Sequence, residues 1–127
     1  RKKFKVIVIT NQSGVARGLY AEEDIKKLHK WVKYELKKKK AKIDDFFYCP
    51  YHPHGLIKKY KKKSFLRKPE PGMILKAKKK HNIDLKNSFM IGDQKSDEIC
   101  AKKVKLNFFY KKNNLLKDIK IILKKIN

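Results

Sequence analysis

Phe4-Lys5-Val6-Ile7-Val8-Ile9-Thr10-Asn11-Gln12-Ser13-Gly14, residues 4–14, is the stretch that decides the fold class. Its first part is rich in β-branched residues, is apolar on both alternating faces, and leads into a polar turn. A strand that is apolar on both faces is typical of a parallel sheet covered by helices on each side. The sequence therefore predicts a buried parallel strand over residues 4–10.

Helical and strand-like segments alternate after this strand. An amphipathic helix is expected over residues 21–41, because apolar residues recur at spacings of three and four and acidic residues occupy its first turn. The other expected elements are strands over residues 43–48, 88–91 and 106–110 and helices over residues 71–80, 96–103 and 115–126. This order predicts an α/β fold in one domain over residues 1–127, with a mostly parallel sheet and helices on both faces.

Polar motifs follow three of the expected strands: Thr10-Asn11, the proline-containing loop of residues 49–68, and Gly92-Asp93. Ligands bind outside the carboxyl ends of parallel strands, so we expect these motifs to share one edge of the sheet. The oxygens of Asp93 and Asp97 suit Mg²⁺. The alternative is that Asp93 caps a helix and Asp97 is an exposed helix residue.

The same edge offers groups that bind phosphate. Thr10 and Asn11 supply hydroxyl, amide and backbone donors for phosphoryl oxygens, although the segment would serve equally well as a turn. Arg67 and Lys68 are adjacent cations in a loop that prolines stiffen, and rigid cations neutralise phosphate charge. These residues together indicate a phosphate site.

The net charge of +24 suggests nucleic-acid binding, because basic surfaces displace counterions from phosphate backbones. However, only Arg1, Arg17 and Arg67 are arginine among the 36 basic residues, and the lysines accompany many Ile and Asn residues, which is typical of A/T-rich coding. We therefore do not expect a nucleic-acid partner. The sequence contains no apolar run long enough to span a membrane and only two cysteines, which predicts a cytoplasmic protein without membrane contact.

In this order the segments resemble the haloacid dehalogenase (HAD) superfamily of phosphatases, in its D,D-heptose 1,7-bisphosphate and histidinol-phosphate phosphatase branch. The similar stretches are residues 6–18, 43–53, 67–73 and 83–97. The resemblance implies a Rossmann-like HAD core. It also implies that Thr10 and Asn11 hold the transferring phosphate and that Lys68 bridges this phosphate to the nucleophile.

By the same resemblance, Arg67 would contact the substrate, Asp93 would ligate Mg²⁺, and Asp97 would lie behind Asp93 without touching the metal. The implied activity is hydrolysis of a sugar phosphate through an aspartyl-phosphate. The expected substrate is D-glycero-D-manno-heptose 1,7-bisphosphate, at its 7-phosphate, in the synthesis of ADP-heptose for the lipopolysaccharide core. The alternatives are a histidinol-phosphate phosphatase fragment and a non-catalytic basic binding protein.

Two catalytic aspartates of the family, in an Asp-x-Asp-Gly motif, have no counterpart in these 127 residues. Asp44 and Asp45 are adjacent, so they cannot present two carboxylates on one face of a strand. In the family the strand with this motif lies between the strands that correspond to residues 4–10 and 88–91. We therefore expect an incomplete sheet with a gap at this place. We also expect a carboxyl-terminal portion of a phosphatase that is inactive without an amino-terminal segment.

Many members of this branch bind structural zinc in the loop that corresponds to residues 49–68. The four ligand positions here read Cys49, Tyr51, Ser64 and Leu66, so one thiolate is left. Structural zinc needs four ligands, which predicts a loop without zinc. His52 and His54 could join Cys49 in a different cluster, but no fourth ligand is obvious.

Without zinc, the loop is expected to depend on its prolines and on packing of Tyr48, Tyr51 and Phe65, and to be mobile over residues 58–63. His29 and His81 are expected to be packing or surface residues.

Overall fold

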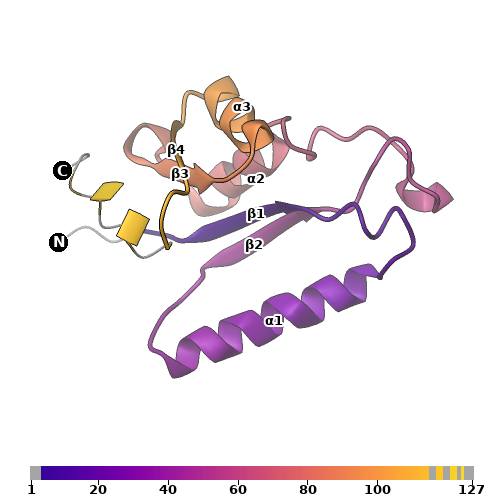
Figure 1. Cartoon of the computed structure of the whole chain (residues 1–127), viewed down its shortest axis with the longest axis horizontal. Coiled ribbons are helices and arrows are strands. Elements are labelled where there is room, and N and C mark those ends of the chain that lie inside the picture. The colour runs from indigo at the N-terminus through magenta and orange to yellow at the C-terminus, as the bar shows by residue number, and fades with distance from the viewer. Residues whose placement is uncertain (1–3, 115–116, 119–120, 123, 125–127) are drawn as a thin grey trace.

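The computed structural model of the chain describes residues 4–114, 117–118, 121–122 and 124 (Figure 1). Its strands are β1 (Ile7–Asn11), β2 (Asp45–Cys49), β3 (Phe89–Gly92) and β4 (Asn107–Tyr110). Its helices are α1 (Glu22–Lys38), α2 (Gly72–His81) and α3 (Lys95–Lys103), with the short 3₁₀ helices η1 (Lys58–Tyr60) and η2 (Leu85–Asn87). The predicted alternation is confirmed, whereas the helix expected over residues 115–126 falls largely outside the described residues.

The strands pair in parallel, as the alternation predicts. β1 pairs with β2, with Thr10 opposite Tyr48, and β3 pairs with β4, with Phe89 opposite Asn107. Within the described residues no strand joins β1 to β3, so there are two separate two-stranded sheets. This interruption lies where the sequence predicts a gap.

Helices cover both faces of the β1–β2 sheet (Figure 1). Phe46 of β2 faces α1, where the His29 ring stacks on it with ring centroids 4.0 Å apart. The next residue, Phe47, points to the opposite face, and its ring centroid lies 6.3 Å from that of His81 at the end of α2. The alternating side chains of β2 thus place one helix on each side, and both histidines have packing roles.

The apolar core lies around α2, α3 and the β3–β4 sheet. Its buried residues are Ile74, Cys100, Ala101 and Leu106, and Ile9 of β1 packs against them. The expectation of a fully buried first strand is wrong, because the residues of β1 are only half-buried and Val6 before it is 48% exposed. The physical reason is that no described strand covers the free edge of β1.

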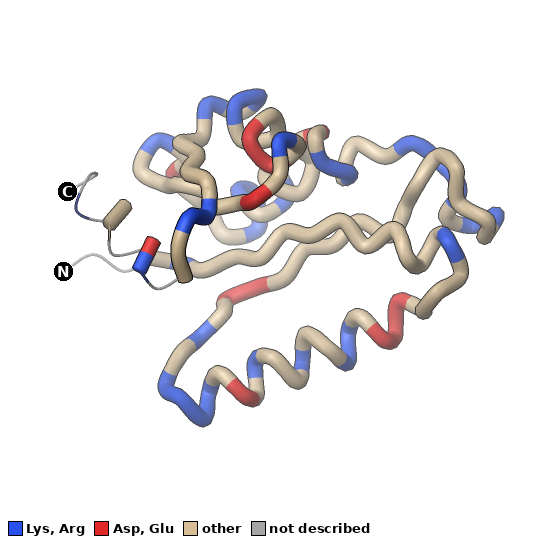
Figure 2. The backbone as a smooth tube through the Cα atoms, viewed as in Figure 1, with Lys and Arg blue, Asp and Glu red and all other residues tan. Residues whose placement is uncertain are grey.

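Lys and Arg residues lie along each described helix and along the loop between β2 and α2 (Figure 2). None of the described helices is both long and apolar enough to cross a membrane.

Candidate phosphate site

Thr10 and Asn11 form the carboxyl end of β1, as predicted. The Thr10 hydroxyl donates to the carbonyl of Asn11 (3.4 Å) and accepts from the Gln12 side-chain amide (3.2 Å). The tight turn after Gln12 brings Tyr20 back, and its hydroxyl donates to Gln12 Oε1 (2.6 Å). The turn is therefore fixed by its own polar side chains, with the Thr10 hydroxyl at its start.

Asn11 connects the end of β1 to the loop before α2. Its Nδ2 donates to the carbonyl of Lys68 (3.2 Å), and its Oδ1 accepts from the Lys68 backbone amide (3.0 Å). Two opposed hydrogen bonds fix both the distance and the orientation of the Lys68 backbone. The Asn11 side chain thus positions Lys68, and its predicted contact with phosphate stays a prediction.

Lys68 reaches α3 through its side chain. Its Nζ lies 2.6 Å from Asp97 Oδ1, and the two side chains are only 13% and 5% exposed. The other carboxylate oxygen of Asp97 accepts from the backbone amide of Gln94 (3.1 Å), the N-cap residue directly before α3. The reading of Asp97 as an exposed helix residue is therefore wrong, because this carboxylate is held by a buried cation and by the start of its own helix.

Gly92 makes this burial possible. A Cβ atom at Gly92 would lie 2.6 Å from Asp97 Oδ2 and 2.7 Å from Asp97 Cβ. Contacts this short cannot exist, so any side chain here would push Asp97 away from Lys68. The glycine that the sequence places before Asp93 thus leaves room for the ion pair.

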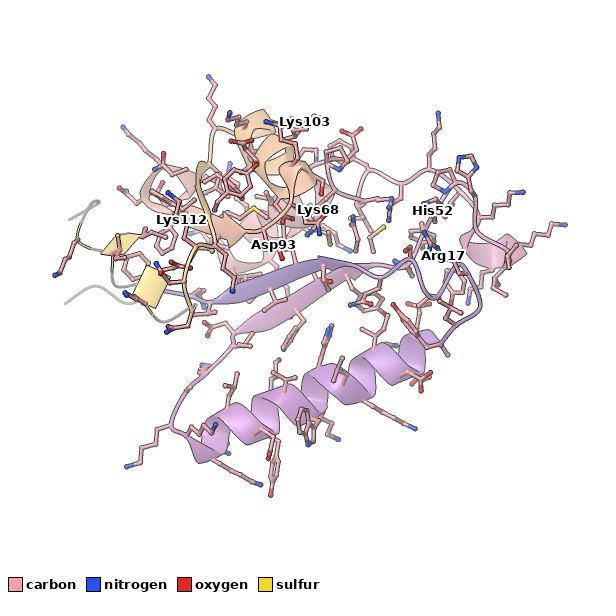
Figure 3. All side chains as sticks on the ribbon, in the orientation of Figure 1. Arg17, His52, Lys68, Asp93, Lys103 and Lys112 are labelled. Carbon is pink, nitrogen blue, oxygen red and sulfur yellow. The ribbon has the colours of Figure 1, made fainter. Side chains whose placement is uncertain are left out.

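Asp93 follows β3 directly and is exposed. Figure 3 shows Asp93 and Lys68 in one region of the molecule, between β1 and α3. A carboxylate oxygen is a suitable ligand for Mg²⁺, so Asp93 fits the metal as one ligand. Within the described residues no group of three His, Cys, Asp or Glu side chains could hold a metal ion, so these residues do not complete a magnesium site.

Arg67 lies next to Lys68 and borders a cavity of about 350 Å³ that Pro53, Ser64 and Lys68 also line. Its Nη1 atom is buried and has no hydrogen-bond partner among the described residues. A buried charged donor without a partner costs free energy, and an acceptor that reached this atom would offset that cost. This arrangement supports the predicted substrate contact of Arg67.

The positions that correspond to zinc ligands have other partners. Cys49 is buried, with its thiol 3.9 Å from the carbonyl of Tyr51, and the Ser64 hydroxyl accepts from the backbone amide of Leu66 (3.1 Å). The Nδ1 atom of His52 accepts from the backbone amide of His54 (3.0 Å). Neither this donor set nor its arrangement fits the tetrahedral site that structural zinc requires.

The expected packing of the loop is wrong at Phe65, whose side chain is 58% exposed. Part of the stretch expected to be mobile forms the 3₁₀ helix η1, and Tyr60 at its end donates a hydrogen bond to Glu22. An exposed phenyl ring contributes little apolar burial, whereas the ring of Tyr51 packs near that of Tyr60, with centroids 6.0 Å apart. Polar contacts from α1 add to this packing.

Two polar networks of the structure were not predicted from the sequence. In one, Glu22 accepts hydrogen bonds from Tyr48 and Tyr60. In the other, Asp45 Oδ2 lies 2.8 Å from Lys80 Nζ and 2.7 Å from His81 Nε2. Burial raises the pKa of Asp45, but the hydrogen bonds from Lys80 and His81 outweigh it and bring this pKa to about 2. The partners in both networks are distant in sequence, so no local spacing could have revealed them.

Known proteins are similar to this chain over most of its length. Residues 65–110 match the family model described as HAD-hydrolase-like. A D-glycero-β-D-manno-heptose-1,7-bisphosphate 7-phosphatase of Rhodopseudomonas palustris is 46% identical over 78% of this chain and 55% of its own length. The α-heptose counterpart of Photorhabdus laumondii is 45% identical over 74% of this chain and 51% of its own length. The chain thus spans about half the length of the curated relatives it matches.

Two crystal structures share the fold. A HAD-like phosphatase of Mesorhizobium loti has a TM-score of 0.76 and 32% identity over 81% of this chain and 49% of its own. The sequence match, the order of motifs and the parallel α/β fold make this chain similar to the HAD-like hydrolases.

The second structure is that of a protein whose name states its substrate. It is the D,D-heptose 1,7-bisphosphate phosphatase of B. bronchiseptica, complexed with magnesium and phosphate, with a TM-score of 0.69 and 27% identity over 82% of this chain and 54% of its own.

Proposed function

We propose that this chain supplies phosphate-binding residues and one magnesium ligand of a phosphatase that acts on the 7-phosphate of D-glycero-D-manno-heptose 1,7-bisphosphate. The observation that carries the proposal is the fixed position of Lys68. Its backbone is bound on both sides by Asn11 and its ammonium group is bound by buried Asp97. The names of the relatives supply the substrate.

Each residue has a part in phosphoryl transfer. The Lys68 ammonium group would neutralise charge on the transferring phosphate, while Asp97 keeps this group in place. The Thr10 hydroxyl would donate to a phosphoryl oxygen. Asp93 would hold Mg²⁺, which supplies positive charge to the phosphate when bound. The unsatisfied Arg67 guanidinium would bind a more distant part of the substrate.

The nucleophile is not among these residues, since the sequence contains no Asp-x-Asp motif. We therefore expect the 127-residue chain alone to release no phosphate from heptose bisphosphate with Mg²⁺. Co-expression with a relative's segment that contains the Asp-x-Asp strand should restore release. Turnover by the chain alone would show that the assignment of the nucleophile is wrong.

In the complemented enzyme, Lys68→Ala should lower kcat by about a hundredfold or more, because a cation next to the transferring phosphate is lost. Asp93→Asn should weaken Mg²⁺ binding by a similar factor, about a hundredfold, because a carboxylate ligand is replaced by an amide. Lys79→Ala, on the exposed side of α2, is the matched control and should leave both values unchanged. Unchanged kcat in Lys68→Ala would remove this loop from the phosphate site.

A further inference from the structure

Glu22, in the first turn of α1, binds two tyrosine hydroxyl groups at once. Tyr48 donates to its Oε1 (2.6 Å) and Tyr60 donates to its Oε2 (2.5 Å). The three side chains come from three segments: the start of α1, the strand β2, and the end of η1. One carboxylate therefore joins the sheet to the loop that follows it.

The ionisation states of Glu22, Tyr48 and Tyr60 favour these two hydrogen bonds. The hydrogen bond from Tyr48, followed by that from Tyr60, lowers the pKa of Glu22, so its carboxylate is ionised at neutral pH. Burial and the bond to Glu22 raise the pKa of Tyr48, and the bond to Glu22 raises that of Tyr60. Both phenols thus stay protonated and able to donate, and hydrogen bonds to an ionised acceptor are stronger than neutral ones.

Tyr60 connects Glu22 to the candidate site through backbone hydrogen bonds. Its carbonyl accepts from the backbone amide of His52 (3.1 Å), and the carbonyl of His52 accepts from the amide of Lys62 (3.2 Å). Pro53, the residue after His52, lines the cavity beside Arg67. Burial, followed by the positive charge of Arg67, lowers the pKa of His52.

We propose that Glu22 is a positioning residue that holds the loop of residues 50–63 through Tyr60, with Tyr48 as the anchor in the sheet, and thereby fixes the Pro53 wall of the Arg67 cavity. The loop has no donor set for zinc, and this carboxylate supplies a cross-link between α1, β2 and η1 instead. Its effect on the loop is independent of the substrate, whereas its effect on substrate binding rests on the proposed function.

The effect on the loop is tested by amide hydrogen exchange of the 127-residue chain, followed by NMR. In Tyr60→Phe and in Glu22→Gln, the amides of His52 and Lys62 should exchange about fivefold faster, as expected when a net hydrogen bond of ordinary strength is lost from a local opening. The amide of Leu106, which donates to the carbonyl of Ala101 in α3, should keep its rate.

Tyr51→Phe is the matched control in the same loop. The structure describes no hydrogen bond from the Tyr51 hydroxyl, so its loss should not change exchange at His52. Equal acceleration at Leu106, or no acceleration at His52 and Lys62 in either variant, would overturn the proposal.

The binding of two probes distinguishes a positioning role of Glu22 from a general loss of structure in the loop. The affinity of the chain for heptose 1,7-bisphosphate should fall about fivefold in Tyr60→Phe, because the sugar reaches the cavity wall, while that for inorganic phosphate should not change. An equal fall for both probes would contradict the positioning role. If the unaltered chain binds neither probe, the proposed function fails, and the exchange rates still decide whether Glu22 holds the loop.

Discussion

The region of residues 65–110 and the region of residues 4–63 differ in what holds them together. The first surrounds a buried apolar cluster that includes Ile74 and Leu106. In the second, α1 buries Ile25 but leaves Leu28 and Trp31 51% and 59% exposed. Here the cross-links are polar side chains such as Glu22. Burial of apolar side chains therefore stabilises mainly the first region, while directed hydrogen bonds set the geometry of the second.

The largest effect on stability is expected from a cavity in the apolar cluster. Ile74→Ala should lower the free energy of unfolding by about 2–4 kcal/mol, since a buried side chain is lost and the cavity collapses only in part. Leu28→Ala, at an exposed position of α1, should change it by less than about 0.5 kcal/mol. Denaturant titration measures both, and equal costs would contradict the difference between the regions.

The next largest effect concerns Asp45, which joins the two regions through Lys80 and His81. Its pKa in the folded protein is about 2, below the ordinary value of 3.8. The folded state therefore binds this proton less readily than the unfolded state, so the stabilisation is present above the ordinary pKa and is lost as the pH falls towards the folded value.

Asp45→Asn should thus cost about 1–2 kcal/mol at neutral pH, and the difference from the unaltered chain should shrink as the pH falls from about 5 to about 2. Unfolding curves across this range measure the effect. Glu23→Gln, at a position whose ion pair is largely exposed, is the control and should change the free energy of unfolding by less than about 0.5 kcal/mol at neutral pH. A cost that stays constant with pH would exclude the ion pair as its source.

A smaller effect is expected at Phe65, where the structure and the sequence-based expectation disagree. Because its ring is 58% exposed, Phe65→Ala should cost less than about 1 kcal/mol. A buried phenylalanine would cost about 3–5 kcal/mol. The shift in urea midpoint distinguishes the two, and a large shift would restore aromatic packing as the support of this loop.

No effect is expected from metal removal. A chelator should leave the melting temperature of the chain unchanged, and elemental analysis should find well under one zinc per chain, because three of the four ligand positions are Tyr51, Ser64 and Leu66. Stoichiometric zinc that is lost together with stability would contradict this and point to Cys49, His52 and His54.

Local sequence pattern was enough to predict where the strands end. The apolar run before Thr10 and the glycine before Asp93 place both residues at the carboxyl ends of parallel strands, and in the structure Thr10 is near the end of β1 and Asp93 follows β3. The interruption between β1 and β3 was also predicted, from the family's order of strands. These features depend on residues close together in the chain or on a known topology.

The cross-links could not be predicted in the same way. Asn11 and Lys68 are 57 positions apart, and Glu22 and Tyr60 are 38 apart. A polar side chain does not encode which distant partner it meets, since that depends on how the elements pack. The burial of Asp97 likewise follows from Lys68 reaching α3, and no spacing within residues 93–97 indicates it. The cytoplasmic location and the lack of a nucleic-acid partner stay predictions.

The edge of β1 that no described strand pairs with has a consequence for the behaviour of the chain in concentrated solution. Unpaired backbone amides and carbonyls along a strand are a template on which another chain can add by β-sheet pairing, and this leads to aggregation. The net charge of +24 opposes such self-association, because like-charged molecules repel one another. Salt shortens the range of this repulsion. Colloidal stability of the 127-residue chain should therefore be greatest at low ionic strength, and added salt should promote ordered aggregates that grow from this edge.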